Sequence, residues 1–318
     1  MKNKTKKIVI PVVSVLAAAA VAVGAYFPVS SAIRTNLNGQ TLSSEFLKGI
    51  EQSGGFELTN GADVRIMSAN ILVRYKGWGG TPVKSRALMF AEVLNKYKPD
   101  VAALQEACSD WHSCLEKTVG DTYEFVEPRF DLVRTSLTTM IYNKNTLNLI
   151  ESGRVKYSQG DGPQHRAITW ALFETKADGK RFIAISTHFD PLRLKDTEKE
   201  YDIIFSQADE LFSFIDELSE KYNCPIFSAG DYNACEVEGD IGESAGVPIY
   251  KKVSEQLEDV KYLTEDRKYG SEIGENDPCW DHIFLTGEAE IKSFRILSDS
   301  YLSPLSDHYP IFTDVSLS

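Results

Sequence analysis

Basic side chains are scarce in this sequence. Its 34 lysines and arginines stand against 46 aspartates and glutamates, which gives a formal net charge of −12. Proteins that bind nucleic acid without reading its sequence depend largely on neutralising phosphates with basic side chains. The charge therefore argues against a high-affinity DNA-binding protein without excluding a nuclease, and its simplest role is to keep the protein soluble.

Histidine and cysteine are also few, with five of each. No group of thiols or imidazoles resembles a zinc site. The sequence contains no internal repeat, and no low-complexity segment beyond its N-terminus. Its composition, 42% hydrophobic and 25% charged, is ordinary for a globular protein with a sizeable core.

The first 32 residues have the pattern of an export signal. Four lysines between Lys2 and Lys7 precede an uncharged run from Ile8 to Val29, and Ser30-Ser31-Ala32 fits the small-x-small pattern of a signal peptidase site. Residues 1–32 are therefore a cleaved signal peptide, or a membrane anchor through residues 8–29, because the run is long enough to span a bilayer. Both alternatives predict an extracytoplasmic protein, secreted or associated with a membrane through this segment.

Without the four leader lysines, 30 basic residues stand against 46 acidic ones, a net charge of −16. Residues 33–62 lack strong periodicity and are rich in glycine, so we interpret them as a linker or a loosely attached N-terminal extension. From residue 63 onward, short apolar runs alternate with helical patterns. Helices are predicted from Thr81-Pro82 to Pro99 and from Asp196 to Tyr222. Strands are predicted at residues 64–72, 100–105, 123–126, 138–142, 167–173, 181–187, 225–229, 280–285 and 310–315.

Many short strands with few helices, some adjacent in sequence, indicate mixed rather than purely parallel sheets. Two sheets packed face to face, with helices outside, would bury these apolar strands on both faces. We therefore predict an α/β (α+β) fold for residues 63–318, a four-layer sandwich of two packed mixed β-sheets flanked by helices.

Polar side chains recur where the predicted strands end. They are Asn70, Glu106, His188, Asp231, Asn233, Asp281, Asp307 and His308. Each alone has an ordinary explanation, such as a solvated strand end, a surface histidine or a turn. Together, four carboxylates, two carboxamides and two imidazoles at strand ends predict an active site.

The segments SAN, LQE, STHFD, GDYN, WDHIF and SDHYP carry these residues and span Ser68 to Pro310. In order and spacing they resemble the endonuclease/exonuclease/phosphatase superfamily. Its members include deoxyribonucleases, abasic-site endonucleases, sphingomyelinases and inositol-phosphate phosphatases. The resemblance implies a two-sheet sandwich, and a hydrolase that cleaves phosphate esters with water and a divalent cation.

The resemblance also implies metal ligands. Glu106 would be the principal ligand, with Asn70 and Asp307 beside it, binding directly or through water. Such oxygen ligands suit Mg²⁺, with Mn²⁺ or Ca²⁺ as alternatives.

The remaining residues would act on the phosphate. Asp231 and Asn233 would hold the attacking water and a phosphate oxygen, and His188 would also contact the phosphate. Asp281 would orient His308 and favour its charged form. The general base is Asp231 or His308, and we prefer Asp231.

Three further residues are candidates for substrate binding. Arg166 resembles an arginine of many secreted superfamily members, with a structural ion pair as an equal alternative. Arg74 and Trp78 lie in the loop after Asn70, where they would add positive charge and a stacking ring to the rim.

The substrate stays open. A phosphodiesterase or nuclease is the leading hypothesis, and a lipid or inositol-phosphate phosphoesterase, similar to sphingomyelinases, is the alternative. Outside enzymes, the chain would be a catalytically dead binding protein on the same fold, which its complete residue set argues against. No protein partner is evident.

A disulfide is also predicted. If Asn233 and Asp281 converge on one phosphate, the cysteines two residues away from them, Cys235 and Cys279, should be near neighbours. Since an exported chain permits disulfides, we expect these two to be bonded.

Overall fold

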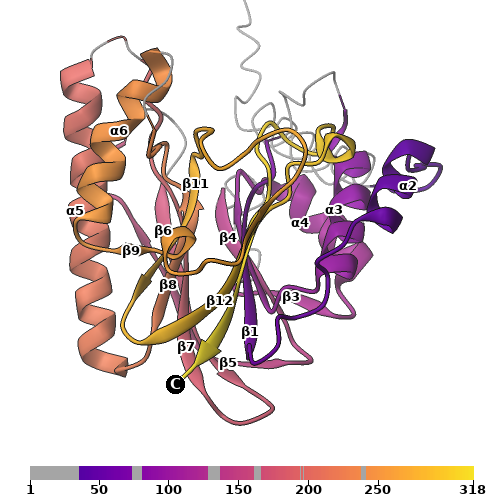
Figure 1. Ribbon diagram of the computed structural model, residues 1–318, viewed down its shortest axis with the longest axis horizontal. Coiled ribbons are helices and arrows are strands. Elements are labelled where there is room, and N and C mark those ends of the chain that lie inside the picture. Colours follow the sequence, from indigo (N-terminus) through magenta and orange to yellow (C-terminus); the bar gives the residue numbers. More distant parts are fainter. Residues whose placement is uncertain are drawn as a thin grey trace, which may run out of the picture.

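Two β-sheets packed face to face form the centre of the molecule, and helices cover both outer faces (Figure 1). This computed structural model describes residues 36–73, 81–127, 137–160, 166–193, 195, 197–237 and 241–318. The predicted sandwich of two mixed sheets flanked by helices is confirmed. The predicted leader lies outside the described residues, and within them no helix is both long and apolar enough to cross a bilayer.

The first sheet has seven strands and is mixed. In spatial order they are β10 (Arg267–Tyr269), β12 (Ala289–Ile296), β13 (Ile311–Leu317), β1 (Val64–Asn70), β2 (Val101–Gln105), β4 (Thr138–Asn143) and β3 (Tyr123–Phe125). Strand β1 lies parallel to β2 and antiparallel to β13. Both β1 and β2 are buried along their whole length, which places them at the centre of the sandwich.

The second sheet has six strands. In spatial order they are β5 (Leu147–Lys156), β6 (Ala167–Thr175), β7 (Arg181–His188), β8 (Ile226–Asp231), β11 (Asp281–Thr286) and β9 (Glu258–Asp259). Strands β7 and β8 are parallel, and the other pairs are antiparallel. The carboxyl ends of β7 and β8 therefore meet at one edge.

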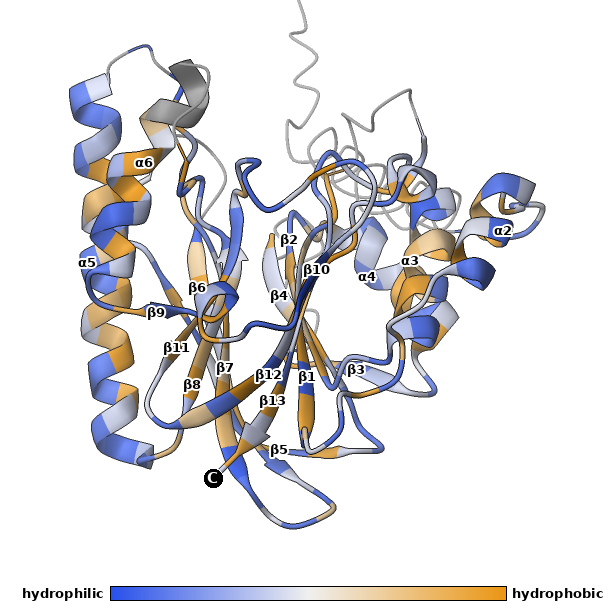
Figure 2. Ribbon diagram, in the orientation of Figure 1, coloured by the Kyte–Doolittle hydropathy of each residue, from blue (hydrophilic) through white to orange (hydrophobic). Residues whose placement is uncertain are grey.

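Helices form the two outer layers. On one side lie α2 (Ser44–Gln52), α3 (Val83–Tyr97) and α4 (Ser109–Val119), and on the other α5 (Thr197–Tyr222) and α6 (Ile241–Ser254) (Figure 1). The described residues also contain two 3₁₀ turns, η2 (Val260–Tyr262) and η3 (Ser300–Leu302). The apolar stripe of α5 faces the second sheet (Figure 2), as its 3-4 spacing predicts.

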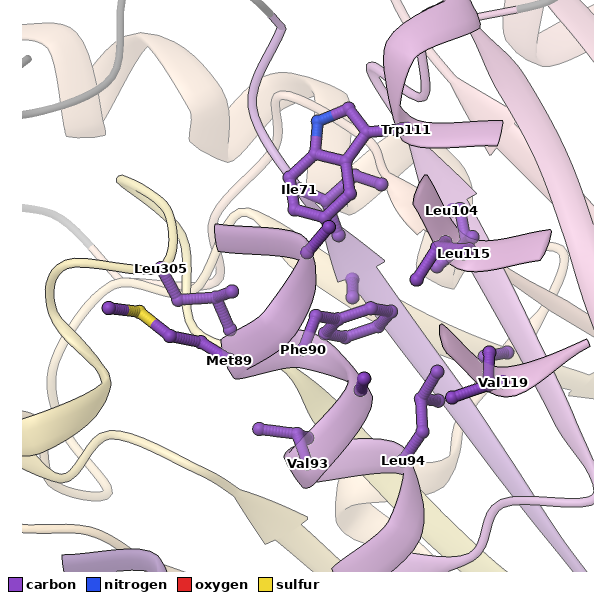
Figure 3. Close-up of a cluster of buried hydrophobic side chains, with 14 of the residues drawn as sticks. Ile71, Met89, Phe90, Val93, Leu94, Leu104, Trp111, Leu115, Val119 and Leu305 are labelled. Atoms are coloured by element: carbon purple, nitrogen blue, oxygen red, sulfur yellow. The ribbon is translucent and has the colours of Figure 1, made fainter. Parts of the chain in front are cut away.

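The alternation of side chains along each strand divides the core into three layers. On β1, Ile66 packs between the sheets while Met67 packs outward against the α3 side. Figure 3 shows the outward layer, where Phe90 and Leu94 of α3 lie close to Leu104 of β2. With apolar layers on both faces, the strands are held firmly and their ends are fixed in space.

Several elements, among them α2 and β5, were not predicted from the sequence. The interpretation of residues 33–62 as a linker missed α2, which buries Phe46 and Ile50 in the outer core and is capped by Ser43. The nine residues of α2 have one apolar face, but the glycines before and after them favour the interpretation as a linker. Strand β5 was missed because most of its residues are at least partly exposed, so its pattern is not apolar.

The predicted disulfide between Cys235 and Cys279 is wrong, since both residues are thiols. Cys279 packs in the layer between the sheets, and its Sγ donates to the carbonyl of Asp281 at 3.0 Å. Cys235 instead packs against α6 at Gly246, where an added Cβ would lie 3.0 Å from its Sγ. The two thiols therefore point into different layers.

A buried network of charged side chains joins strands β9 and β11 of the second sheet to the loop after β8. His282 of β11 contacts Asp259 Oδ2 through Nδ1 at 3.0 Å and the carbonyl of Ala234 through Nε2 at 3.1 Å. A carbonyl and a carboxylate only accept hydrogen bonds, so both ring nitrogens carry a proton. Burial by itself lowers the pKa of His282, but the hydrogen bond and charge of Asp259 outweigh it and raise the pKa to about 9.

Lys261 and Glu236 complete this network. Lys261 Nζ binds Glu236 Oε1, and both side chains are buried. The two positive groups, His282 and Lys261, thereby balance the two carboxylates of Asp259 and Glu236. The network fixes the loop that follows β8, and His282 points away from its neighbour Asp281, as expected for adjacent strand residues.

The His282 network predicts a loss of stability at alkaline pH. The pKa of His282 is about 9 in the folded protein, above the ~6.5 of an unfolded histidine. Its contribution is therefore complete below about pH 6.5 and is lost as pH rises through about 9. Urea unfolding across this range should show wild type more stable than His282→Gln near neutrality, with a gap that narrows at alkaline pH. The difference in stability between wild type and Asp259→Asn should also become smaller as the pH rises. If neither difference changes with pH, His282 is not charged in the folded protein as assigned.

Candidate active site

Three predicted residues form one row across the end of the second sheet. In register, His188 of β7 pairs with Asp231 of β8, and Asp231 pairs with Asp281 of β11. Alternation explains why all three face the first sheet: Phe227 and Ala229, four and two residues before Asp231, lie in the layer between the sheets. The apolar layer thus ends in a polar row at this edge.

Asn70 reaches this row from the first sheet. It ends β1 on the inward-facing side, and its Nδ2 donates to Asp231 Oδ2 at 3.0 Å. Its Oδ1 accepts from the backbone N–H of Leu72 at 3.1 Å, which fixes the orientation of the amide. Gln105, the register partner of Asn70 on β2, donates through Nε2 to Ser186 Oγ at 3.2 Å, so a second polar contact joins the sheets.

Asp231 is the centre of the site. Its Oδ2 lies 3.2 Å from His188 Nε2 and 3.7 Å from His308 Nε2, and its Oδ1 accepts from the backbone N–H of Asn233 at 2.9 Å. Burial by itself would raise the pKa of Asp231, but the charges of His188 and His308 outweigh it and hold that pKa far below the ordinary value. Asp231 is therefore ionised at neutral pH.

Asp281 and His308 form a close pair. His308 Nδ1 lies 2.6 Å from Asp281 Oδ2, and the imidazole side chain is 20% exposed. Burial lowers the pKa of His308, but the negative charges of Asp281 and Asp231 raise it to about 10. The ring is thus an imidazolium at neutral pH, with Nε2 at the surface of the site.

Two further carboxylates lie at the same edge. Glu106 follows β2, and its Oε2 accepts from the backbone N–H of Val73 at 2.8 Å. Asp307 is exposed and precedes β13. Ser306 Oγ donates to the carbonyl of Asn70 at 2.6 Å, which attaches this loop to the end of β1. Glu106, Asp307 and Asn70 therefore lie at the same edge of the first sheet, and their role as metal ligands stays a prediction.

This donor set fits a hydrated hard cation. No group of three or more His, Cys, Asp or Glu side chains in the described part of the chain would hold a metal by itself. Mg²⁺ needs no such group, because it keeps several waters and binds through one or two carboxylates together with substrate phosphate. Glu106 and Asp307 supply two carboxylates, and Glu106 Oε1 accepts no hydrogen bond from the described residues.

Backbone strain gathers around the site. Positive φ angles occur at Leu72 (57°), Glu106 (62°) and Asn233 (48°). Such angles are uncommon for residues other than glycine, and for a bulky residue they persist only where the surroundings enforce them. In the described part of the chain only two other non-glycine residues share the property, and both follow helix ends. Strain at these three positions supports a functional site.

The other predicted residues have different outcomes. Arg166 forms a buried ion pair with Asp190, Nε to Oδ1 at 3.2 Å, which is the structural alternative, and its contact with substrate stays a prediction. Arg74 and Trp78 lie outside the described residues. Arg86 was not predicted, although a charged residue on the apolar face of α3 is a visible signal.

No protein-family model matches the chain, and no curated protein matches its sequence. Solved structures do match its fold. An endonuclease/exonuclease/phosphatase from Bacteroides vulgatus is 21% identical with a TM-score of 0.64, over 80% of this chain and 99% of that one. A Bacteroides thetaiotaomicron mannosyl-6-phosphatase is 19% identical with a TM-score of 0.62, over 79% and 99% of the two chains.

D. rerio TDP2, complexed with a single-strand DNA product, is 18% identical with a TM-score of 0.58, over 79% of this chain and 98% of that one. At these identities the likeness shows the fold alone. The chain has the fold of endonuclease/exonuclease/phosphatase proteins, and the resemblance predicted from its motifs is confirmed at that level.

The contact between Asp281 and His308 predicts that they act as a unit. Asp281→Asn removes the charge that orients the imidazolium, so either Asp281→Asn or His308→Ala should remove most of the shared contribution. Each should lower the rate by ~100 to 10,000-fold, and the double variant should lose little more. A double-mutant cycle on hydrolysis rate measures this, and fully additive losses would show that the residues act independently.

The chain offers a matched control for this cycle. Asp259 and His282 form a similar pair outside the site, at 3.0 Å. Asp259→Asn and His282→Gln should lower stability, while the folded fraction keeps its rate to within a few-fold.

Proposed function

We propose that the chain is a divalent-metal-dependent hydrolase that cleaves phosphate esters by attack of water, with phosphodiesters as its main substrates. The observation that supports this most is the arrangement around Asp231. Asn70, His188 and His308 surround one carboxylate oxygen at 3.0, 3.2 and 3.7 Å. The carboxylates of Glu106 and Asp307 lie at the same edge of the sandwich.

A phosphate ester suits this arrangement because it is anionic and repels nucleophiles. Glu106 would hold the cation, with Asn70 and Asp307 bound directly or through water. When bound, the cation offsets the charge that grows on phosphate in the transition state. The His308 imidazolium would face the same phosphate from the other side and donate a hydrogen bond to it or to the leaving oxygen.

The two candidate bases differ in protonation. His308 already carries its proton at neutral pH, because its pKa is about 10. Asp231 is ionised, so it is the group that can receive a proton from water. Its low pKa makes it a weak base, and we assign it first to orienting the water and second to accepting that proton. Asn233 would contact a phosphate oxygen through the amide hydrogen that is not used on the carbonyl of Phe189.

The substrate class rests on weaker support. A nucleic-acid phosphodiester is supported by the likeness to TDP2, which was solved with a single-strand DNA product. A small phosphorylated molecule is the second candidate. It is supported by the likeness to a mannosyl-6-phosphatase and by the net charge of −12, which disfavours a long polyanion.

The proposal predicts that cation binding and activity depend together on Glu106. Glu106→Gln keeps the shape and removes the charge, so Mn²⁺ affinity and hydrolysis should both fall by at least about 10-fold. Calorimetric titration measures the affinity. Activity is measured with Mg²⁺, Mn²⁺ or Ca²⁺ on DNA, RNA, bis-p-nitrophenyl phosphate, p-nitrophenyl phosphate, inositol phosphates and sphingomyelin.

Glu174→Gln is the control. Glu174 of β6 forms an ion pair with the exposed Arg181 of β7, away from the proposed ligands. Its substitution should leave affinity and rate unchanged. The proposal is wrong if folded wild type hydrolyses none of these esters with any of the three cations. The metal assignment alone is wrong if wild type is active and Glu106→Gln binds Mn²⁺ equally well.

We also propose that the protein is exported, secreted or anchored by residues 8–29, on the strength of its lysine-rich leader and the uncharged run that follows. Fractionation of cells that express the full chain should place it outside the cytoplasm. N-terminal sequencing then separates a cleaved signal peptide from an anchor. Recovery only in the cytoplasm with an intact N-terminus would contradict export.

A further inference from the structure

Arg86 of α3 is completely buried, with 0% of its surface exposed. Its guanidinium pairs with no carboxylate among the described residues and donates instead to backbone carbonyls. These are Ile71 O at 2.6 Å, Leu72 O at 2.9 Å, Leu305 O at 3.3 Å, Val73 O at 3.3 Å and Thr81 O at 3.2 Å. Burying a charged group costs free energy unless its donors are satisfied. Because this guanidinium is buried and its donors are all directed at carbonyls, we expect it to have a specific role in the structure.

The carbonyls belong to segments that carry the proposed metal ligands. Residues 71–73 directly follow Asn70, and Leu305 lies two residues before Asp307. One planar guanidinium thus holds the loop after β1 and the loop before β13 at a fixed separation. The N–H groups of Ile71 and Leu305 donate to the carbonyls of Gln105 and Leu302. The carbonyls that Arg86 contacts in these two loops lie outside the helices and strands.

Trp111 of α4 holds the same segment from a second direction. Its Nε1 donates to Leu72 O at 2.9 Å, and its ring lies 5.1 Å from the Arg86 guanidinium. Figure 3 shows the Trp111 ring close to Ile71 and above Phe90 of α3. Leu72 is the bulky residue with a φ of 57°, so two donors hold the carbonyl of a strained residue.

The strained segment is hydrogen-bonded to Glu106. The backbone N–H next in the chain, that of Val73, donates to Glu106 Oε2 at 2.8 Å. Burial lowers the pKa of Arg86, and the charges of Cys108, Asp307 and Glu106 oppose that shift, so both carboxylates lie within electrostatic reach of the guanidinium. Geometry and charge therefore connect Arg86 with both carboxylates.

We infer that Arg86, supported by Trp111, is a positioning residue that presets Glu106 and Asp307 for a divalent cation. It touches neither cation nor substrate and acts through the carbonyls of residues 71–73 and 305. The inference rests on the proposed function, because it requires a cation at Glu106. It goes further by naming the residue that determines how well that site is formed before the cation arrives.

The test compares two buried arginines. Arg65 is 2% exposed and lies on the same strand-and-helix layer, and it too donates to backbone carbonyls, those of Phe56, Glu57 and Tyr97. It also pairs with Asp314 at 2.6 Å. Because it holds the opposite end of β1, Arg65→Lys should lower stability without changing the cation site.

Arg86→Lys keeps the charge but replaces three nitrogens with one, so it cannot satisfy all five carbonyls, which Nε, Nη1 and Nη2 reach between them. Its Kd for Mn²⁺ should rise about 10- to 100-fold, and high Mn²⁺ should restore much of its activity. Arg65→Lys should keep the wild-type Kd despite a comparable loss in urea unfolding. Calorimetric titration of each purified, folded protein with Mn²⁺ gives the Kd.

Trp111→Phe keeps the ring and removes one hydrogen bond, so it covers the case in which Arg86→Lys does not fold. Its Kd for Mn²⁺ should rise about 5-fold, the factor for one lost hydrogen bond. An unchanged Kd in the folded variants, or an equal rise in Arg65→Lys, overturns the positioning role. If wild type itself binds no Mn²⁺, the proposed function fails first and this inference fails with it.

Discussion

The negative charge of Asp231 is the interaction on which the site depends. A carboxylate buried between two sheets is costly unless several donors compensate it. Here the donors come from both sheets, Asn70 from the first and His188 from the second. The apolar layer between the sheets holds the strands through contacts that have no preferred direction. The hydrogen bond from Asn70 to Asp231 adds a directional link between the sheets at the edge where the other polar side chains gather.

Strain and polar support occur together around that edge. Leu72 and Glu106 both have positive φ angles, and the hydrogen bond from Val73 to Glu106 joins the two segments. Arg86 balances this strain from the helix side. On the second sheet, the balanced network around His282 stabilises β11 and the loop after β8 from outside the site. The site is thus formed by residues that never contact a ligand as much as by those that would.

The sequence predicted what is apolar and periodic. The inward alternation that ends in Asp231 and Asn70 is visible in the printed residues, and so is the long stripe of α5. Strand β5 was missed because most of its positions are exposed or half-buried. The amphipathic helix α2 was missed because glycines flank it on both sides and indicate a linker. The disulfide failed for a different reason. Proximity of Asn233 and Asp281 does not determine where cysteines two residues away point. Cys279 packs between the sheets, whereas Cys235 packs against Gly246 of α6.

The position of β13 has a consequence for the order of events during synthesis. Although it is the strand farthest along the chain, it lies between β12 and β1 near the middle of the first sheet. Ribosomes release the N-terminal strands first, but β1 lacks its antiparallel neighbour until residues 311–317 emerge. His308, just before β13, also arrives late. A nascent chain therefore lacks part of the polar row around Asp231 until residues 308–317 are available, and this edge of the sandwich is completed late.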